Sequence, residues 1–279
     1  MVGAVLGDVA GSIYEGRRLR TKTKPDFLID ERCHFTDDAV MTCAVAEALM
    51  DLDEVVQGGD PVADPRLQAE ISKAVAVSLK SWGRLYPHAG YGGGFKNWLR
   101  GDSTAPYGSW GNGAAMRVSF VGWAARTLEE AVVLGRLTSA VTHDHPSALR
   151  AAAVTAGSIF ALRQGGGPAE VERLAREAGY DLSFALDEIR PDYRFDVTCD
   201  GSVPQAIKCF LEARDFEDAL KLAISLGGDS DTMAAVAGSL AEVVHPAPEA
   251  LLERAWAKLD GKIIALLDRA DDFLKRKGR

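Results

Sequence analysis

Four cysteines in 279 residues are too few, and too irregularly spaced, to form a disulfide framework or a thiolate metal site. Cys33, Cys43, Cys199 and Cys209 each lie in or beside an apolar stretch, so we expect buried free thiols in a reducing compartment. The chain also lacks an apolar run of the ~18 residues that a membrane span requires. Its first residues lack the basic region of a signal peptide. We therefore expect a soluble cytoplasmic protein.

Positive charge is also in short supply. The chain has 32 lysines and arginines against 40 aspartates and glutamates, which gives a net charge of −8. This balance argues against a nucleic-acid backbone as the main partner. No proline- or serine-rich linker, charge run or internal repeat divides the chain, so we interpret residues 1–279 as a single domain. The sequence does not fix the oligomeric state, although a monomer is favoured.

Strand-like alternation is scarce, and residues 194–200 are the best example of it. Helical periodicity dominates instead and predicts an all-α, compact, multi-helix domain. We expect Thr36 to cap one helix at its start, Gly83 to end another, and Pro168, Pro204 and Pro248 to stand in first turns. The predicted helices cover residues 37–52, 66–83, 113–127, 128–142, 146–164, 168–178, 203–213, 216–225, 231–244 and 248–277.

Two irregular segments interrupt this pattern. Residues 15–35 are polar and basic, and residues 86–112 are dense in glycine and aromatic side chains. Long loops in a helical domain are commonly functional, so we expect both segments to border a site.

Two distant segments share hydroxyl groups and paired carboxylates at a predicted helix start. One is Thr36-Asp37-Asp38, and the other runs from Asp229 through Ser230 and Asp231 to Thr232. If the two helix starts face each other, four carboxylates repel one another severely unless cations lie between them. Two divalent ions neutralise that charge, whereas each helix dipole contributes only about half a positive charge. Oxygen ligands of this kind suit Mg²⁺, Mn²⁺ or Ca²⁺.

Taken singly, each segment has a plainer interpretation. A lone Thr-Asp-Asp is usually a helix cap with favourable acids in the first turn. The Asp229–Thr232 segment is similar to the nucleophile motif of haloacid-dehalogenase phosphatases, but Met233 follows it and its context is helical. Only the pair of segments together favours a metal site.

These segments belong to a larger set that resembles the ADP-ribosylglycohydrolase family, also called dinitrogenase-reductase-activating glycohydrolases. The similar motifs follow one another in the expected order along nearly the whole chain. They are GAVLGDVAGSIYEG (3–16), FTDDAVM (35–41), YGSWGNGAAMRV (107–118), THDHPSA (142–148), GSVPQAIKCFLEA (201–213) and SLGGDSDTMAAVAG (225–238). The resemblance implies an orthogonal all-α bundle that holds two Mg²⁺ or Mn²⁺ ions.

The resemblance also implies roles for individual residues. Glu15 matches a glutamate on a mobile loop near the metals, and His143 matches a histidine that contacts the phosphate region. Tyr193 or Phe195 is a candidate to stack on adenine. The implied metal ligands are Thr36, Asp37, Asp38, Asp229, Asp231 and Thr232. The implied substrate-binding residues are Glu15, Gly108, Ser109, Trp110, Gly111, Asn112 and His143, and the candidate acids and bases are Glu15, Asp37 and Asp229.

The expected activity is hydrolysis of the glycosidic bond between ADP-ribose and a modified acceptor, either a protein side chain or a small conjugate. Two alternatives remain at this point: a dinuclear-metal phosphohydrolase that cuts the pyrophosphate, and a non-catalytic relative that binds ADP-ribose. The histidines around Asp144 are also compatible with HD phosphohydrolases, but the chain offers no further His-Asp pair upstream. The acceptor (arginine, serine, a nucleic-acid end or an acetyl ester) is not determined by the sequence.

Overall fold

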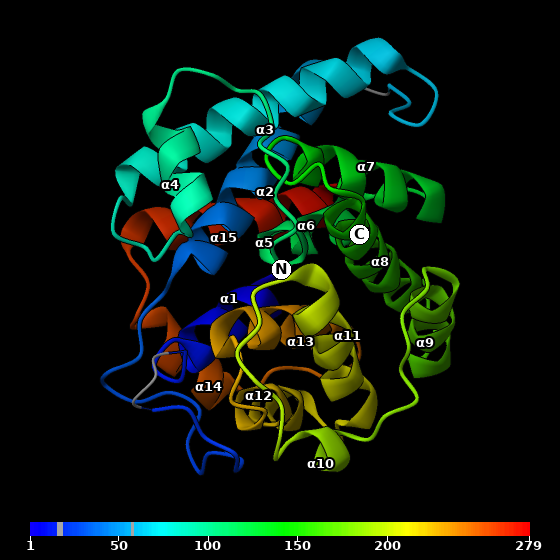
Figure 1. Cartoon of the computed structure of the whole chain (residues 1–279). Coiled ribbons are helices and arrows are strands. Elements are labelled where there is room, and N and C mark those ends of the chain that lie inside the picture. Colours follow the sequence, from blue (N-terminus) through cyan, green and yellow to red (C-terminus); the bar gives the residue numbers. More distant parts are fainter. Residues whose placement is uncertain (16–18, 57–58) are drawn as a thin grey trace.

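The centre of the molecule is a pair of helices from opposite ends of the chain, α1 (Val2–Gly11) and α13 (Ser230–Val244), which lie side by side (Figure 1). Gly3, Gly7 and Gly11 recur every fourth residue and so share one face of α1. A methyl group built on Gly7 would come within 2.1 Å of the Ala234 carbonyl oxygen. The two backbones are therefore in direct contact, which only glycine permits.

The remaining helices pack against this pair or against its neighbours. The computed structural model describes residues 1–15, 19–56 and 59–279, and these residues form fifteen helices and no strand, which confirms the predicted all-α fold. The others are α2 (Asp37–Val56), α3 (Pro65–Leu85), α4 (Gly93–Arg100), α5 (Gly113–Met116), α6 (Ser119–Ala124), α7 (Leu128–Ala140), α8 (Pro146–Arg163), α9 (Pro168–Glu177), α10 (Leu186–Ile189), α11 (Cys199–Glu212), α12 (Phe216–Ser225), α14 (Glu249–Trp256) and α15 (Gly261–Arg276).

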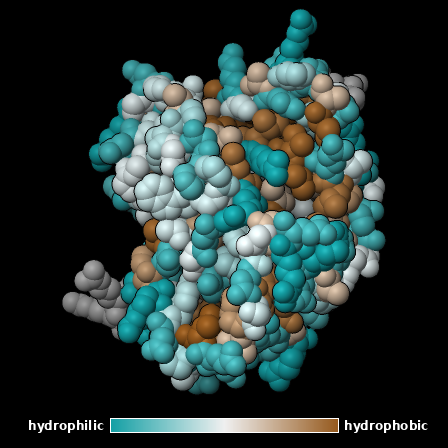
Figure 2. All heavy atoms as spheres, turned by 45° about the vertical axis from the view of Figure 1, so that its right-hand side comes forward, coloured by the Kyte–Doolittle hydropathy of each residue, from teal (hydrophilic) through white to brown (hydrophobic). Residues whose placement is uncertain are grey.

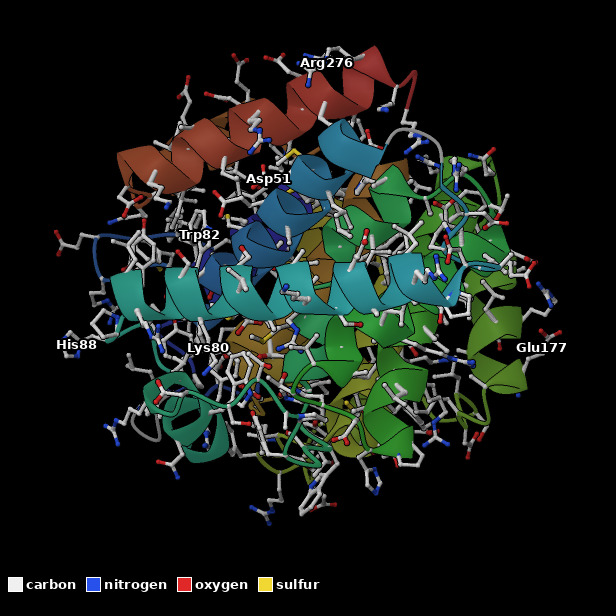
Figure 3. The ribbon with its side chains drawn as sticks, turned by 90° about the horizontal axis from the view of Figure 1, so that it is seen from above. Asp51, Lys80, Trp82, His88, Glu177 and Arg276 are labelled. Carbon is white, nitrogen blue, oxygen red and sulfur yellow. The ribbon has the colours of Figure 1, made fainter. Side chains whose placement is uncertain are left out.

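Helix α2 is held between two long neighbours. Seen from above in Figure 3, α3 crosses in front of α2 and α15 lies along its other side. Trp82 of α3 is fully buried and its indole N–H donates to the Glu47 carboxylate of α2 at 2.7 Å. Arg269 of α15 forms an ion pair with Asp51 of α2 at 2.6 Å. These contacts fix the direction in which the start of α2 points, namely toward α1 and α13.

Several predicted helix boundaries are wrong. Helix α3 continues past Gly83 to Leu85, because Gly83 is buried against Leu99 rather than placed at the helix end. Pro204 lies inside α11, which begins at Cys199 with Thr198 as its cap. The patterns at 113–127 and 248–277 are each broken into two helices, and the strand-like segment forms only an isolated bridge between Gly111 and Thr198. Helices α1, α4 and α10 were not predicted.

The polar surface and the buried thiols agree with what the composition predicts. Figure 2 shows polar residues over most of the face in view, with apolar residues gathered in a hollow in its upper half. All four cysteines are buried and free, as predicted. None of the helices in the described part of the chain combines the length and hydrophobicity that crossing a bilayer requires.

Candidate functional site

A cavity of about 270 Å³ lies where α2 and α13 begin. The two acidic segments, 191 residues apart in the sequence, meet at this cavity: Asp37 and Asp38 border it from α2, and Asp229, Asp231 and Thr232 border it from α13. Thr36 is buried beside them. The structure therefore brings together the residues proposed as metal ligands, although their role as ligands stays a prediction.

The carboxylates form two overlapping triplets. Oxygen atoms of Asp8, Asp38 and Asp231 lie within 4.8 Å of one another, and so do those of Glu15, Asp229 and Asp231. Asp231 belongs to both triplets and is buried together with all the other members except Glu15. Asp37 borders the same cavity but is in neither triplet. Residues 16–18, which follow Glu15 in the motif quoted above, lie outside the described residues.

The sequence analysis missed Asp8 of α1, which is completely buried in this cluster. One of its oxygens accepts hydrogen bonds from the backbone N–H groups of Thr36 (2.8 Å) and Ala39 (3.0 Å), and the other accepts from the Thr36 hydroxyl (2.6 Å). Asp8 thus caps α2 from a different helix. The sequence did offer a signal for this role: Asp8 interrupts an apolar stretch that has glycine at every fourth position.

The cluster raises the pKa values of its own acids. Burial, opposed by hydrogen bonds from Thr36 and Ala39, raises the pKa of Asp8 to about 6. Burial and the neighbouring charge of Asp8 raise the pKa of Asp37 to about 8. The pKa values of Asp38 and Asp231 are raised well above their usual range by burial first and by neighbouring carboxylates second. Two helix ends, at about half a positive charge each, would not neutralise these carboxylates if all of them were ionised.

The donor set suits hard divalent cations. Asp38 Oδ1 is buried and has no hydrogen-bond partner among the described residues. The Thr232 hydroxyl donates to Asp38 Oδ2 at 3.1 Å, and the Thr36 hydroxyl donates to Asp8, so each hydroxyl hydrogen is engaged while oxygen lone pairs remain. Carboxylate and hydroxyl oxygens without thiolate or imidazole are the ligands that Mg²⁺ and Mn²⁺ prefer.

The glycine-rich loop at 107–113 forms one wall of the cavity, but only in part as expected. Ser109, Gly111 and Asn112 border the cavity, whereas Gly108 and Trp110 do not. The Asn112 amide donates to Asp229 Oδ2 at 2.7 Å and so orients that carboxylate. Trp110 is 57% exposed, with its ring edge-on to His145. Helix α5 has only four residues, so the positive helix end expected at this loop contributes little.

A second glycine turn, within the segment 86–112 that was expected to border a site, also lines the cavity. Gly92 and Gly94 border the cavity at the start of α4, where no side chain caps the helix. The N–H groups in the first turn of a helix have no partner within the helix, so they are available to an anionic ligand. A methyl group on Gly90 would come within 2.9 Å of Asp37 Oδ1, and therefore this turn approaches the acids closely.

His143 and Arg117 also border the cavity. His143 is buried and borders the cavity as expected, and burial together with the charge of Arg117 lowers its pKa well below 6.5. Arg117 is also buried, at 1% exposure, and the sequence analysis did not single it out. The lining of the cavity thus includes a buried cation as well as the acids.

The turn before Asp229 is fixed by the basic loop. Gly227 has a positive φ of 66°, and a methyl group there would lie 2.8 Å from the Thr21 carbonyl oxygen. Lys22 donates to the carbonyl oxygens of Leu226 (2.6 Å) and Tyr193 (2.7 Å). Lys22 therefore holds the segment that carries Asp229 against the aromatic segment around Tyr193. Phe195, in the same segment, lies under the Arg20 guanidinium at 4.3 Å.

Comparisons with known proteins agree with this architecture. The sequence model of the ADP-ribosylglycohydrolase family matches residues 1–278. The protein named ADP-ribosylhydrolase ARH3 is 25% identical over 315 residues in Mus musculus and in Homo sapiens, covering 86% of this chain and 81% and 83% of those proteins. The Bos taurus protein is 26% identical, with 86% and 82% covered. A solved structure described as an ADP-ribosylglycohydrolase-related protein complex has the same fold, with a TM-score of 0.66, 23% identity and coverage of 98% and 95%.

Proposed function

The chain belongs to the ADP-ribosylglycohydrolase family of hydrolases, and we propose that it uses two divalent cations to release ADP-ribose from a modified acceptor. The bond cleaved is the N- or O-glycosidic bond between the anomeric carbon of ADP-ribose and a protein side chain or a small conjugate. The observation that carries this proposal is a cavity bordered by four buried or half-buried aspartates and Thr232, with Asp8 and Thr36 buried beside them.

The acids and hydroxyls of the cluster have a common task in this proposal. Bound cations would supply positive charge beside the ribose and hold a water molecule. The residues that would hold them are Thr36, Asp37, Asp38, Asp229, Asp231 and Thr232. Asp8 supports these ligands indirectly, because its carboxylate fixes the Thr36 hydroxyl.

Three carboxylates are candidates to move the proton. In the reaction, a water oxygen bonds to the anomeric carbon while the bond from that carbon to the acceptor breaks. The acceptor leaves with the bonding electron pair and takes up a proton, and the water gives up one proton to a carboxylate. Glu15, Asp37 and Asp229 all border the cavity, and burial is the first cause of a raised pKa in each, the direction that favours proton uptake by a general base.

The cavity lining outside the acidic cluster suits the diphosphate of the substrate. Ser109 and Asn112 of the first glycine loop, the start of α4 and His143 all border the same space. Three N–H groups of the loop already donate within the protein: Gly108 to Asp144, Gly111 to the Ser109 hydroxyl and Asn112 to the Val197 carbonyl. The proposed anion contacts therefore fall to the α4 turn and to His143 rather than to the first loop alone.

The test is product analysis with a panel of substrates: ADP-ribosylated arginine, serine and DNA ends, and acetyl-ADP-ribose, each with Mg²⁺, with Mn²⁺ and with EDTA. We expect intact ADP-ribose from at least one substrate, and only with a divalent cation. Release of AMP and ribose phosphate would instead identify a phosphohydrolase. Binding of ADP-ribose without turnover of any substrate would identify a binding protein. Asp231→Asn is the inactive control.

A further inference from the structure

His143 is held by a chain of polar side chains that the proposed function does not explain. Its ring lies in the link between α7 and α8, and its Nδ1 atom is 2.7 Å from the Thr142 hydroxyl oxygen. The other nitrogen, Nε2, is directed at the glycine loop, since a methyl group built on Gly113 would come within 3.1 Å of it and one on Gly111 within 3.6 Å. One ring nitrogen thus faces protein and the other faces the loop that borders the cavity.

Arg117 contacts Thr142, the residue that holds the His143 ring. Its Nη2 donates to the Thr142 hydroxyl at 2.8 Å and to the Ser139 carbonyl oxygen at 3.1 Å. No carboxylate among residues 1–15, 19–56 and 59–279 forms an ion pair with it, and burial lowers its pKa to about 10. Arginine has only donors, so the Thr142 oxygen must accept from it.

The remaining question is which partner supplies the hydrogen between Thr142 and His143. If the imidazole donated from Nδ1, the Thr142 hydroxyl hydrogen would have no acceptor in the described part of the chain, although Thr142 is fully buried. If the hydroxyl donates to Nδ1, both the oxygen and the hydrogen of the Thr142 hydroxyl have a partner. A buried polar group without a partner costs about 1–3 kcal/mol, so the second arrangement is strongly preferred.

We infer that Arg117 and Thr142 are positioning residues that hold His143 as the neutral tautomer with its proton on Nε2. In this form His143 presents a hydrogen-bond donor, and not an acceptor, toward an anionic oxygen of the ligand. The identity of that ligand as the diphosphate of ADP-ribose rests on the proposed function, whereas the tautomer rests only on the contacts above. The low pKa of His143 agrees with a neutral ring.

The test combines ¹⁵N NMR of the histidine ring with ADP-ribose binding by calorimetry in the presence of Mg²⁺. The two-bond couplings between the carbon-bound ring hydrogens and the two ring nitrogens identify which nitrogen carries the proton. Thr142→Val removes the hydroxyl at nearly constant shape, and Thr142→Ser keeps it. Thr155→Val is the matched control, because Thr155 is equally buried but its hydroxyl has no hydrogen-bond partner.

We expect the ligand-free protein to carry the His143 proton on Nε2, with Nδ1 accepting a hydrogen bond. In Thr142→Val, the ¹⁵N spectrum should no longer show a hydrogen bond accepted by Nδ1. This variant should also bind ADP-ribose roughly 3- to 10-fold more weakly, in line with one lost hydrogen bond. Thr142→Ser and Thr155→Val should resemble the unmodified protein in both measurements.

Two results would overturn the inference: a proton on Nδ1 in the unmodified protein, or unchanged ADP-ribose affinity in Thr142→Val. If Thr142→Val does not fold, the tautomer of the unmodified protein and of Thr142→Ser decides the matter. If the unmodified protein does not bind ADP-ribose at all, the proposed function fails, but the tautomer is still measured.

Discussion

Removing divalent cations should make the stability of this protein depend steeply on pH between 7 and 8. The acids of the cluster have raised pKa values, so the folded protein without cations keeps protons that the unfolded chain has lost. For such groups the stabilising effect of the proton is complete below the ordinary pKa and is lost as the pH rises through the raised value. Asp37, with a pKa of about 8, titrates inside this window.

The size of the effect follows from that value. Between pH 7 and 8, the proton that Asp37 still binds in the folded state, and has lost in the unfolded state, lowers the free energy of unfolding by about 1 kcal/mol. The raised pKa values of Asp38 and Asp231 act in the same direction. A loss of 1 kcal/mol corresponds to a decrease in Tm of about 2–4 °C for a domain of this size.

Cations should remove this dependence, because they displace the protons they compete with. At a free concentration 100 times the Kd, Mg²⁺ adds about 2.7 kcal/mol to the stability, and its effect should be larger at pH 8 than at pH 7. His143 does not interfere, since its lowered pKa leaves it neutral throughout. The four buried thiols also destabilise the fold at high pH, but equally with and without cations.

The assay is thermal unfolding followed by circular dichroism at pH 7.0, 7.5 and 8.0, in EDTA and in Mg²⁺. The quantity compared is the difference in Tm between the two conditions at each pH. We expect this difference to grow with pH, and to vanish in Asp231→Asn. A difference that is constant or shrinks with pH would refute the account of the cluster as mutually repelling acids that need cations.

Three further predictions concern single residues. Asp231→Asn should lower turnover at least roughly 100-fold while leaving the helical circular dichroism spectrum near native, since it removes the acid common to both triplets; near-normal turnover would contradict the site. Asp8→Asn should destabilise the protein by about 1–3 kcal/mol in urea unfolding and weaken its response to Mg²⁺, because the amide keeps one oxygen for the Thr36 and Ala39 N–H groups but turns an NH₂ donor toward the Thr36 hydroxyl. Gly7→Ala should cost about 3 kcal/mol or more by forcing α1 from α13, whereas Gly261→Ala, with nothing within 4 Å, should be nearly neutral.

The helices that could be predicted are those with local sequence signals, namely a capping residue and apolar residues at helical spacing. Helix α12 matches the prediction at both ends, because Asp215 caps its start and its apolar residues recur at helical spacing. Helix α1 was missed because three glycines in ten residues weaken an isolated helix by about 1 kcal/mol each. Those glycines have a reason only in the tertiary structure, where α13 packs against them.

The residues of the candidate site also fall into two groups, those that local sequence patterns identify and those that they do not. The two acidic segments were recognisable because each repeats the same hydroxyl and carboxylate pattern at a helix start. Arg117 was not recognisable, because an arginine in an apolar stretch resembles a surface residue until its partners Ser139 and Thr142 are known. Residues whose role depends on a partner distant in the sequence cannot be identified from local pattern alone.

The capping of α2 explains why Asp8 and the close contact of α1 with α13 belong to the same arrangement. A threonine at the start of a helix ordinarily uses its own oxygen to accept from the third N–H of the helix. Here the Asp8 carboxylate accepts from that group, the Ala39 N–H, and also fixes the Thr36 hydroxyl hydrogen. The Thr36 oxygen accepts only a long hydrogen bond from the Asp38 N–H, at 3.4 Å, and so keeps a lone pair for the proposed cations. Asp8 reaches this position only because glycines bring α1 against α13, and so the packing of one helix pair frees a ligand on a third helix.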